Sequence, residues 1–264
     1  MNNMNFKLDS STKDFDEIFF NRPVSKIQAS WVGLVTSKNV TIKEVSSIYQ
    51  IINEMSHNTA LVADERQFHD AFAVDVSLKP KKTPGYSNID DGIESLRNCK
   101  IIIFLAGKEL NSDMELFMIK LLDNFKGLIV TDYPEIFYDV DFVGQKIIIS
   151  DKNKIKSNYN FGLNHTAGLV QSYAQENKSP VVFFDKNQII CLDSNHKDTA
   201  CIVNSKETIP KEDFIAFLVS LMSDKKIPLE ADWLRYCQAA GYLTRKMQTE
   251  GLRSVKKYLE EKFL

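Results

Sequence analysis

The chain has 264 residues, 44% of them hydrophobic and 26% charged, and its formal net charge is −2. This composition is typical of a globular protein that buries a sizeable core, and it lacks the basic excess of a nucleic-acid-binding protein. No apolar run approaches the ~20 residues that span a bilayer. The polar and acidic start of the chain does not resemble a signal peptide. We therefore expect a cytoplasmic protein with no membrane and no nucleic-acid partner.

Cysteine and histidine are too widely spaced in the chain to predict a metal site. The four cysteines form no C-x-x-C pair and the four histidines form no i, i+4 pair. Each cysteine lies in or beside an apolar run, which favours buried free thiols and agrees with a cytoplasmic location. These residues are Cys99, Cys191, Cys201 and Cys237, and His57, His69, His165 and His196.

Short aliphatic and β-branched runs alternate with amphipathic segments over most of the chain. Strands are expected at residues 31–36, 60–63, 71–76, 100–106, 127–132, 146–150, 180–184, 188–192 and 199–203. Within them, residues 101–105 and 128–130 are continuously apolar, as in central strands that are covered on both faces.

Helices are expected between these strands and throughout the C-terminal third. Residues 41–55 place apolar side chains at helical spacing, and Asn111 is a candidate N-cap for the next helix. A further helix is expected at residues 164–175. Three more follow at residues 211–222, 229–247 and 252–264, with Pro228 and Gly251 between them.

The order of elements predicts an α/β fold with a mostly parallel sheet and right-handed crossovers. Residues 181–184 and 188–192 read as a hairpin, so the sheet is expected to have an antiparallel edge. Residues 78–88 contain two prolines and are expected to form a flexible loop that extends from the fold. We expect an N-terminal extension at residues 1–22 and a single domain at residues 23–264.

Six segments of the chain occur in the order of a family's landmarks. They are Ser25-Lys26-Ile27 before the first strand with Thr36-Ser37-Lys38 after it, Ala106-Gly107-Lys108 after residues 101–105, Thr131-Asp132 after residues 128–130, Asp185-Lys186, and Ile209-Pro210-Lys211-Glu212-Asp213 before an apolar helix. In this order the chain resembles the ADP- or ATP-dependent NAD(P)H-hydrate dehydratase domain of the ribokinase-like superfamily, often labelled a carbohydrate kinase.

The resemblance implies a three-layer α/β/α fold and a set of site residues. Asp213 would be the catalytic base, and the residues expected to bind the nucleotide are Lys26, Ser37, Gly107, Asp132 and Lys186. The implied cofactor is ATP or ADP with Mg²⁺, and the implied partners are that nucleotide, hydrated NAD(P)H and further copies of the chain in a homo-oligomer.

The chain departs from the family at its glycines. The family's turns read Gly-Gly-Ser, Gly-Pro-Gly-Leu-Gly and G-x-G-D, whereas Gly107 is the one glycine retained at these three places. Glycine lets backbone N–H groups approach a phosphate closely. Before Asp213, Pro210 has no N–H, and Glu212 adds a negative charge where a phosphate would bind.

Each candidate residue also has a purely structural interpretation. An acid such as Asp213 in a first helical turn interacts favourably with the helix dipole. Asp132 could form the turn before Tyr133-Pro134. Most lysines are solvated surface residues, and Lys26 and Lys186 have that alternative too.

Three functions therefore stay open. The chain is a nucleotide-dependent NAD(P)H-hydrate dehydratase, a sugar or vitamin-precursor kinase, or a non-enzymatic pseudoenzyme that keeps the fold for binding or assembly and needs no cofactor. The missing glycines favour the third function, and the matched Asp213 and Lys26 argue for the first.

Overall fold

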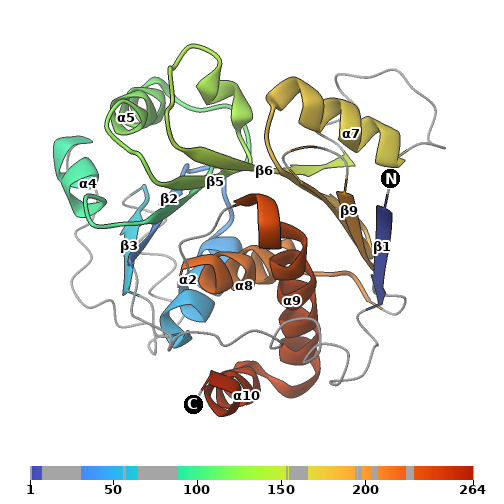
Figure 1. Cartoon of the computed structure of the whole chain (residues 1–264). Coiled ribbons are helices and arrows are strands. Elements are labelled where there is room, and N and C mark those ends of the chain that lie inside the picture. Colours follow the sequence, from blue (N-terminus) through green and yellow to red (C-terminus); the bar gives the residue numbers. More distant parts are fainter. Residues whose placement is uncertain are drawn as a thin grey trace. The chain divides into compact units, whose positions relative to one another are not determined.

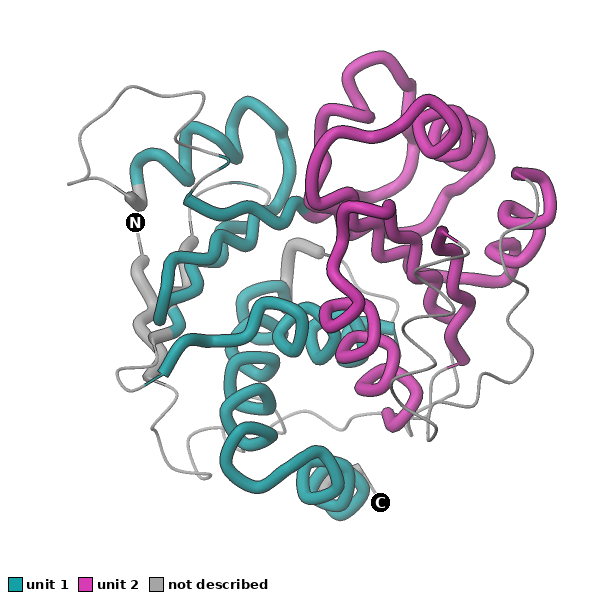
Figure 2. Tube along the Cα trace, turned by 180° about the vertical axis from the view of Figure 1, so that it is seen from behind, with its two compact units in different colours: residues 1–28, 148–264 teal, residues 29–147 magenta. Residues whose placement is uncertain are grey.

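The computed structural model describes residues 2–7, 31–55, 58–64, 89–152, 154, 166–193, 195, 198–203, 207–223 and 229–263. The chain divides into two compact units, one formed by residues 1–28 and 148–264 and the other by residues 29–147 (Figure 2). We call them unit 1 and unit 2. The expected strand at residues 71–76, the excursion at residues 78–88, the four histidines and Lys26 lie outside the described residues.

Among its described residues, unit 2 contains four parallel strands in the spatial order β5-β4-β2-β3. Their bounds are β2 (Trp31–Thr36), β3 (Asn58–Val62), β4 (Ile101–Leu105) and β5 (Leu128–Thr131). All residues of β4 and β5 are buried, as their continuously apolar sequences predict for central strands.

The helices of unit 2 cover both faces of these strands. Helix α2 (Ile42–Glu54) lies on one face, and α4 (Ile89–Ser95) and α5 (Ser112–Leu122) lie on the other (Figure 1). Thr41 and Glu44 form a capping box at the start of α2, and the Asn111 side chain caps α5 as expected. The short α4 and the 3₁₀ helix η1 (Pro134–Phe137) were not expected from the sequence.

The apolar residues of α5 pack against one face of β4. Phe117 and Met118 are completely buried there, together with Ile102 and Phe104 of the strand. Burying a side chain of this size contributes about 1.5–3 kcal/mol, so this layer is a main source of the stability of unit 2.

Unit 1 contains the antiparallel part of the fold. Its strands are β6 (Gln145–Asp151), which begins in unit 2, β7 (Val181–Asp185), β8 (Gln188–Leu192), β9 (Asp198–Val203) and β1 (Asn2–Lys7). Strand β7 is parallel to β6 and antiparallel to β8, and β8 is antiparallel to β9. The mostly parallel fold with an antiparallel part is thus confirmed. Strand β8 is antiparallel to both of its neighbours, and its pair with β7 is the predicted hairpin.

Strand β1 was not expected, because only Met4 and Phe6 of its sequence NNMNFK are apolar and asparagine is depleted in strands. It pairs in parallel with β9, with Asn2 opposite Asp198 and Lys7 opposite Val203. Pairing along a strand edge uses backbone groups, so a polar sequence can form a strand where a partner edge is available. Residues 1–22, expected to be an extension, therefore contain one strand of unit 1.

The described part of unit 1 also contains the helices α7 (Thr166–Asn177), α8 (Lys211–Ser223), α9 (Leu229–Glu250) and α10 (Leu252–Phe263). Helix α7 lies on one face of the unit 1 strands, and α8 and α9 lie on the other (Figure 1). From Asp213 to Ser223 every residue of α8 is buried. The Trp233 indole N–H donates to the carbonyl of Leu192 over 2.7 Å and so links α9 to β8.

None of the helices in the described part of the chain is both long and apolar enough to cross a membrane. The chain forms two compact units, and the organisation of residues 23–264 as a single domain remains a prediction.

Candidate functional site

In unit 2 the parallel strands β2, β4 and β5 end at the same edge of the sheet. Ser37 directly follows β2, Ala106 and Gly107 follow β4, and Asp132 follows β5. Polar residues at the carboxyl ends of parallel strands are where α/β folds commonly bind ligands. Three of the predicted binding residues, Ser37, Gly107 and Asp132, are therefore on one edge of one unit.

The Asp132 carboxylate is bound to the backbone of the turn that follows β4. Its Oδ1 accepts from the N–H of Ala106 over 2.8 Å, and its Oδ2 accepts from the N–H of Gly107 over 3.2 Å. The residue is buried, with 3% of its surface exposed. The next amide, that of Tyr133, donates to Oγ1 of Thr131 instead, over 2.9 Å. Asp132 thus joins β5 to the turn after β4.

We call residues 106–108 the β4 turn. The N–H of Lys108 donates to the carbonyl of Ala106 over 2.7 Å, and the intervening Gly107 has φ 69°. This is the classic γ-turn, a strained conformation that glycine tolerates best. A Cβ on Gly107 would also lie 2.9 Å from the backbone oxygen of Asn39. The one glycine retained from the family's turn is therefore needed for the backbone of this turn itself.

Two residues after β2 bind the β4 turn and the residue that follows it. The Ser37 hydroxyl donates to the carbonyl of Ala106 and accepts from the N–H of Asn39, and the Asn39 side-chain amide donates to the carbonyl of Glu109 over 2.9 Å. Sequence reasoning named Ser37 and missed Asn39, since nothing in the local pattern indicates a contact 70 residues away. The hydroxyl of Ser37 is engaged with the protein's own backbone.

Three carboxylates lie near Tyr133, which follows β5 and Asp132. The pKa of Tyr133 is raised, first by burial and then by the carboxylates of Glu135, Glu115 and Glu109. A phosphate at this edge would be repelled by the same carboxylates.

In unit 1, Asp213 is the third residue of α8, in the first turn as expected, and it is buried. The carbonyl of Pro210 accepts from the N–H of Phe214 over 3.2 Å, which begins the helix. The cap position is therefore filled by a residue that has no N–H. Acidic Glu212 stands beside Asp213 in the same turn.

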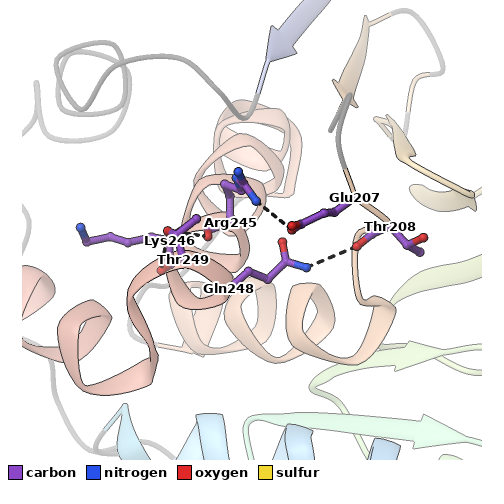
Figure 3. Close-up of polar contacts among 6 residues, drawn as sticks. All are labelled: Glu207, Thr208, Arg245, Lys246, Gln248 and Thr249. Atoms are coloured by element: carbon purple, nitrogen blue, oxygen red, sulfur yellow. Dashed lines mark hydrogen bonds and ion pairs between the residues drawn. The ribbon is translucent and has the colours of Figure 1, made fainter.

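The residues that lead into α8, which we call the entry segment (residues 207–210), are bound by the last turns of α9. Arg245 forms an ion pair of 2.9 Å with Glu207, and the side-chain amide of Gln248 donates to the carbonyl of Thr208 over 3.3 Å (Figure 3). Ile209 is buried. Side-chain contacts thus hold this segment where the resemblance expects a glycine-rich turn.

The first turn of α8 packs on the carboxyl end of β7. The Phe184 and Phe214 rings meet edge to face with centroids 5.7 Å apart, and Phe214 directly follows Asp213. Asp185, next to Phe184, accepts from Gln188 and lies 3.9 Å from the ammonium of Lys152. Lys152, at the end of β6, is a cation that sequence reasoning missed.

Lys186 is the first residue of the two-residue turn between β7 and β8. It has φ 47°, the left-handed region that favours glycine, and the resemblance has glycine at this position. Its conformation is therefore set by the hairpin, and its role toward a nucleotide stays a prediction.

The structure thus brings together Ser37, Gly107 and Asp132 in unit 2, and places Lys186 and Asp213 in unit 1. The amides of Ala106 and Gly107 in the β4 turn bind Asp132, and Pro210, at the cap position of α8, has no amide. Among the described residues, no group of three His, Cys, Asp or Glu side chains could hold a metal ion.

Comparison with known proteins gives structural likeness only. No family model and no curated protein matches the chain by sequence. A ribokinase-like superfamily protein from Enterococcus faecalis is 8% identical, with a TM-score of 0.72 over 98% of this chain and 96% of its own. A hypothetical protein from Streptococcus mutans is also 8% identical, with a TM-score of 0.74 over 97% of this chain and 99% of its own.

An ADP/ATP-dependent NAD(P)H-hydrate dehydratase from Bacillus subtilis, crystallised with ATP and Mg²⁺, is 10% identical. Its TM-score is 0.63 over 95% of this chain and 97% of its own. At these identities a likeness over nearly the whole length establishes the architecture and leaves the chemistry open. The chain has the ribokinase-like fold.

Proposed function

We propose that the protein is a ribokinase-like pseudoenzyme that keeps the fold for binding or assembly and does not transfer phosphate from a nucleotide. The observation that carries this proposal is the start of α8. Pro210 fills the position where a backbone N–H should meet the phosphate, and the entry segment before α8 is bound by Arg245 and Gln248 of α9.

Charge supports the same conclusion. A helix N-terminus attracts an anion through its dipole and its unpaired N–H groups. Here Glu212 and Asp213 are both in the first turn, so two carboxylates already interact with that dipole. A phosphate would have to be placed against their charge without the close backbone approach that glycines allow.

A second candidate is a nucleotide-dependent NAD(P)H-hydrate dehydratase in which Asp213 is the general base. The observation in its favour is the position of Asp213, which is buried in the first turn of a helix that packs on the carboxyl end of β7. A similar fold was crystallised with ATP and Mg²⁺ in the Bacillus subtilis dehydratase. A sugar or vitamin-precursor kinase would need the same phosphate cradle, and no contact favours it over the dehydratase.

Thermal unfolding with millimolar ATP or ADP and Mg²⁺ tests the first proposal. A ligand at a hundredfold excess over its Kd stabilises the native state by about 2.7 kcal/mol, which raises Tm by roughly 5–10 °C for a chain of this size. We expect no such rise, while the Bacillus subtilis dehydratase serves as the positive control. A saturable rise would contradict the loss of nucleotide binding.

Turnover of hydrated NADH separates the two candidates. If the wild type shows turnover, Asp213→Asn should abolish it and leave nucleotide binding in place, because only the proton acceptor is removed. The matched control is Glu212→Gln, which removes the neighbouring charge and should retain turnover. Turnover that survives in Asp213→Asn would exclude Asp213 from the chemistry.

Assembly into a homo-oligomer remains part of the proposal. Leu116 and Ile119, one turn apart on α5, have exposed fractions of 46% and 37%, and an apolar pair of this kind supports contact with another copy. Light scattering after size-exclusion chromatography would measure the mass of the assembly.

A further inference from the structure

Two consecutive backbone amides in unit 2 point at one carboxylate. The N–H groups of Ala106 and Gly107 donate to Oδ1 and Oδ2 of Asp132, over 2.8 and 3.2 Å. Successive N–H groups that converge in a turn form a nest, and nests bind anions in many proteins. Gly107 takes its positive φ directly after its own amide, where the chain turns back toward Lys108.

The carboxylate occupies this nest as a bound anion would. Each of its oxygens accepts one amide, in the two-pronged arrangement that carboxylates make with paired donors. Asp132 is nearly completely buried, so the contacts are shielded from water, which strengthens them. The backbone N–H of Asp132 donates to the carbonyl of Phe104 over 3.4 Å, which ties the backbone of Asp132 to β4.

The third amide of the turn has a different partner. The N–H of Lys108 donates to the carbonyl of Ala106, and that carbonyl also accepts from the Ser37 hydroxyl. The donors of the β4 turn are therefore all engaged within the protein, and an external phosphate would have to displace Asp132 to reach them.

We propose that the β4 turn is an oxyanion site whose resident anion is the Asp132 carboxylate, and that a small carboxylate such as formate binds there once this side chain is removed. The site exists whether or not α8 carries chemistry, so it does not depend on the proposed function. In the wild type the Asp132 carboxylate occupies the site in place of a free anion.

The test is chemical rescue of Asp132→Ala. This variant leaves two buried amides without an acceptor, which should lower Tm by roughly 4–10 °C. Sodium formate, compared with sodium chloride at equal ionic strength, should restore part of that Tm with saturation. The wild type should show no difference between the two salts. Phosphate provides a second arm that reports whether the site also accepts a larger oxyanion.

The matched control is Ser37→Ala. It removes a hydrogen bond to the same turn without removing the anion, so its Tm should fall and formate should give no more recovery than chloride does. Two results would overturn the proposal: a wild-type Tm in Asp132→Ala, or a lowered Tm that formate raises no more than chloride does.

Asp132→Asn covers the case in which the alanine variant does not fold. Its carboxamide keeps one acceptor oxygen and turns an N–H₂ group toward the second amide. Hydrogen exchange of the Ala106 and Gly107 amides should then become faster for one of the two by roughly tenfold or more. Exchange of both amides at the wild-type rate would refute the bidentate contact.

Discussion

Gly107 and Asp132 show how two residues far apart in the sequence produce one turn. The backbone at Gly107 has φ 69°, and the space where a Cβ would stand is taken by the backbone oxygen of Asn39, 2.9 Å away. Asp132 accepts from the amides of Ala106 and Gly107 in the same turn. The turn therefore depends on both residues.

At this scale we predict that Gly107→Ala lowers the free energy of unfolding more than Gly251→Ala does. Both glycines have positive φ, 69° and 83°, which costs an alanine about 1–2 kcal/mol. A Cβ at Gly251 would meet nothing within 4 Å, whereas at Gly107 it would clash with backbone. Urea unfolding of the two variants measures the difference, and equal losses would show that the clash is relieved at no cost.

At the scale of elements, the C-terminal half of α9 supports the start of α8. Arg245 and Gln248 are three residues apart on α9 and reach Glu207 and Thr208, respectively (Figure 3). Thr249 turns back to the carbonyls of Arg245 and Lys246 within its own helix. The position of Asp213 in unit 1 therefore depends on contacts made by a helix that follows it in the sequence.

We predict that the double variant Arg245→Ala/Gln248→Ala speeds amide exchange in peptides that cover residues 207–213. The loss of overall stability should stay near or below about 1 kcal/mol, because Glu207 is 57% exposed and such pairs are weak. Lys257→Ala is the control, since its pair with Glu261 on α10 is exposed at both ends. Unchanged exchange at residues 207–213 would mean that the packing of Ile209 alone holds the segment.

At the scale of the molecule, buried thiols are found in both units. Cys99 lies in unit 2, and Cys191 and Cys237 lie in unit 1, and all three are free and buried. Burial raises the pKa of Cys99 from its ordinary 9.0 to about 12. The pKa of Cys237 is raised as well, by burial and by the neighbouring Cys191 thiol. Thiols of this kind are unreactive in the folded protein.

The raised pKa of Cys99 predicts a loss of stability at alkaline pH. The folded state keeps the thiol protonated, so its contribution is fully present below pH 9 and is lost as the pH rises from 9 toward 12. At pH 10.5 this loss is about 2 kcal/mol, since one pKa unit corresponds to about 1.4 kcal/mol. Urea unfolding of the wild type and Cys99→Ala between pH 8 and 10.5 measures it, and parallel pH dependences would contradict the assignment to Cys99.

Local patterns in the sequence predicted most of the described elements because those patterns have local causes. The apolar run at residues 101–105, the cap at Asn111 and the turn at Lys186-Asn187 each need only neighbouring residues to take effect. The missed elements have other origins. Strand β1 needs the edge of β9, which is almost 200 residues away, and α4 is a helix of two turns with little periodicity to detect.

The candidates Lys26, Ser37, Gly107, Asp132, Lys186 and Asp213 came from the resemblance to a family. The sequence by itself determined the α/β class and most of the order of strands and helices. It did so because strand ends and helix starts are encoded locally. Only the tertiary structure decided what these residues contact. The carboxylate of Asp132 meets amides 25 and 26 residues earlier, and Arg245 reaches Glu207 over 38 residues. Such contacts depend on how distant parts of the chain come together in the fold, which local patterns do not encode. In the β4 turn, where the resemblance places a phosphate, the amides of Ala106 and Gly107 bind the carboxylate of Asp132.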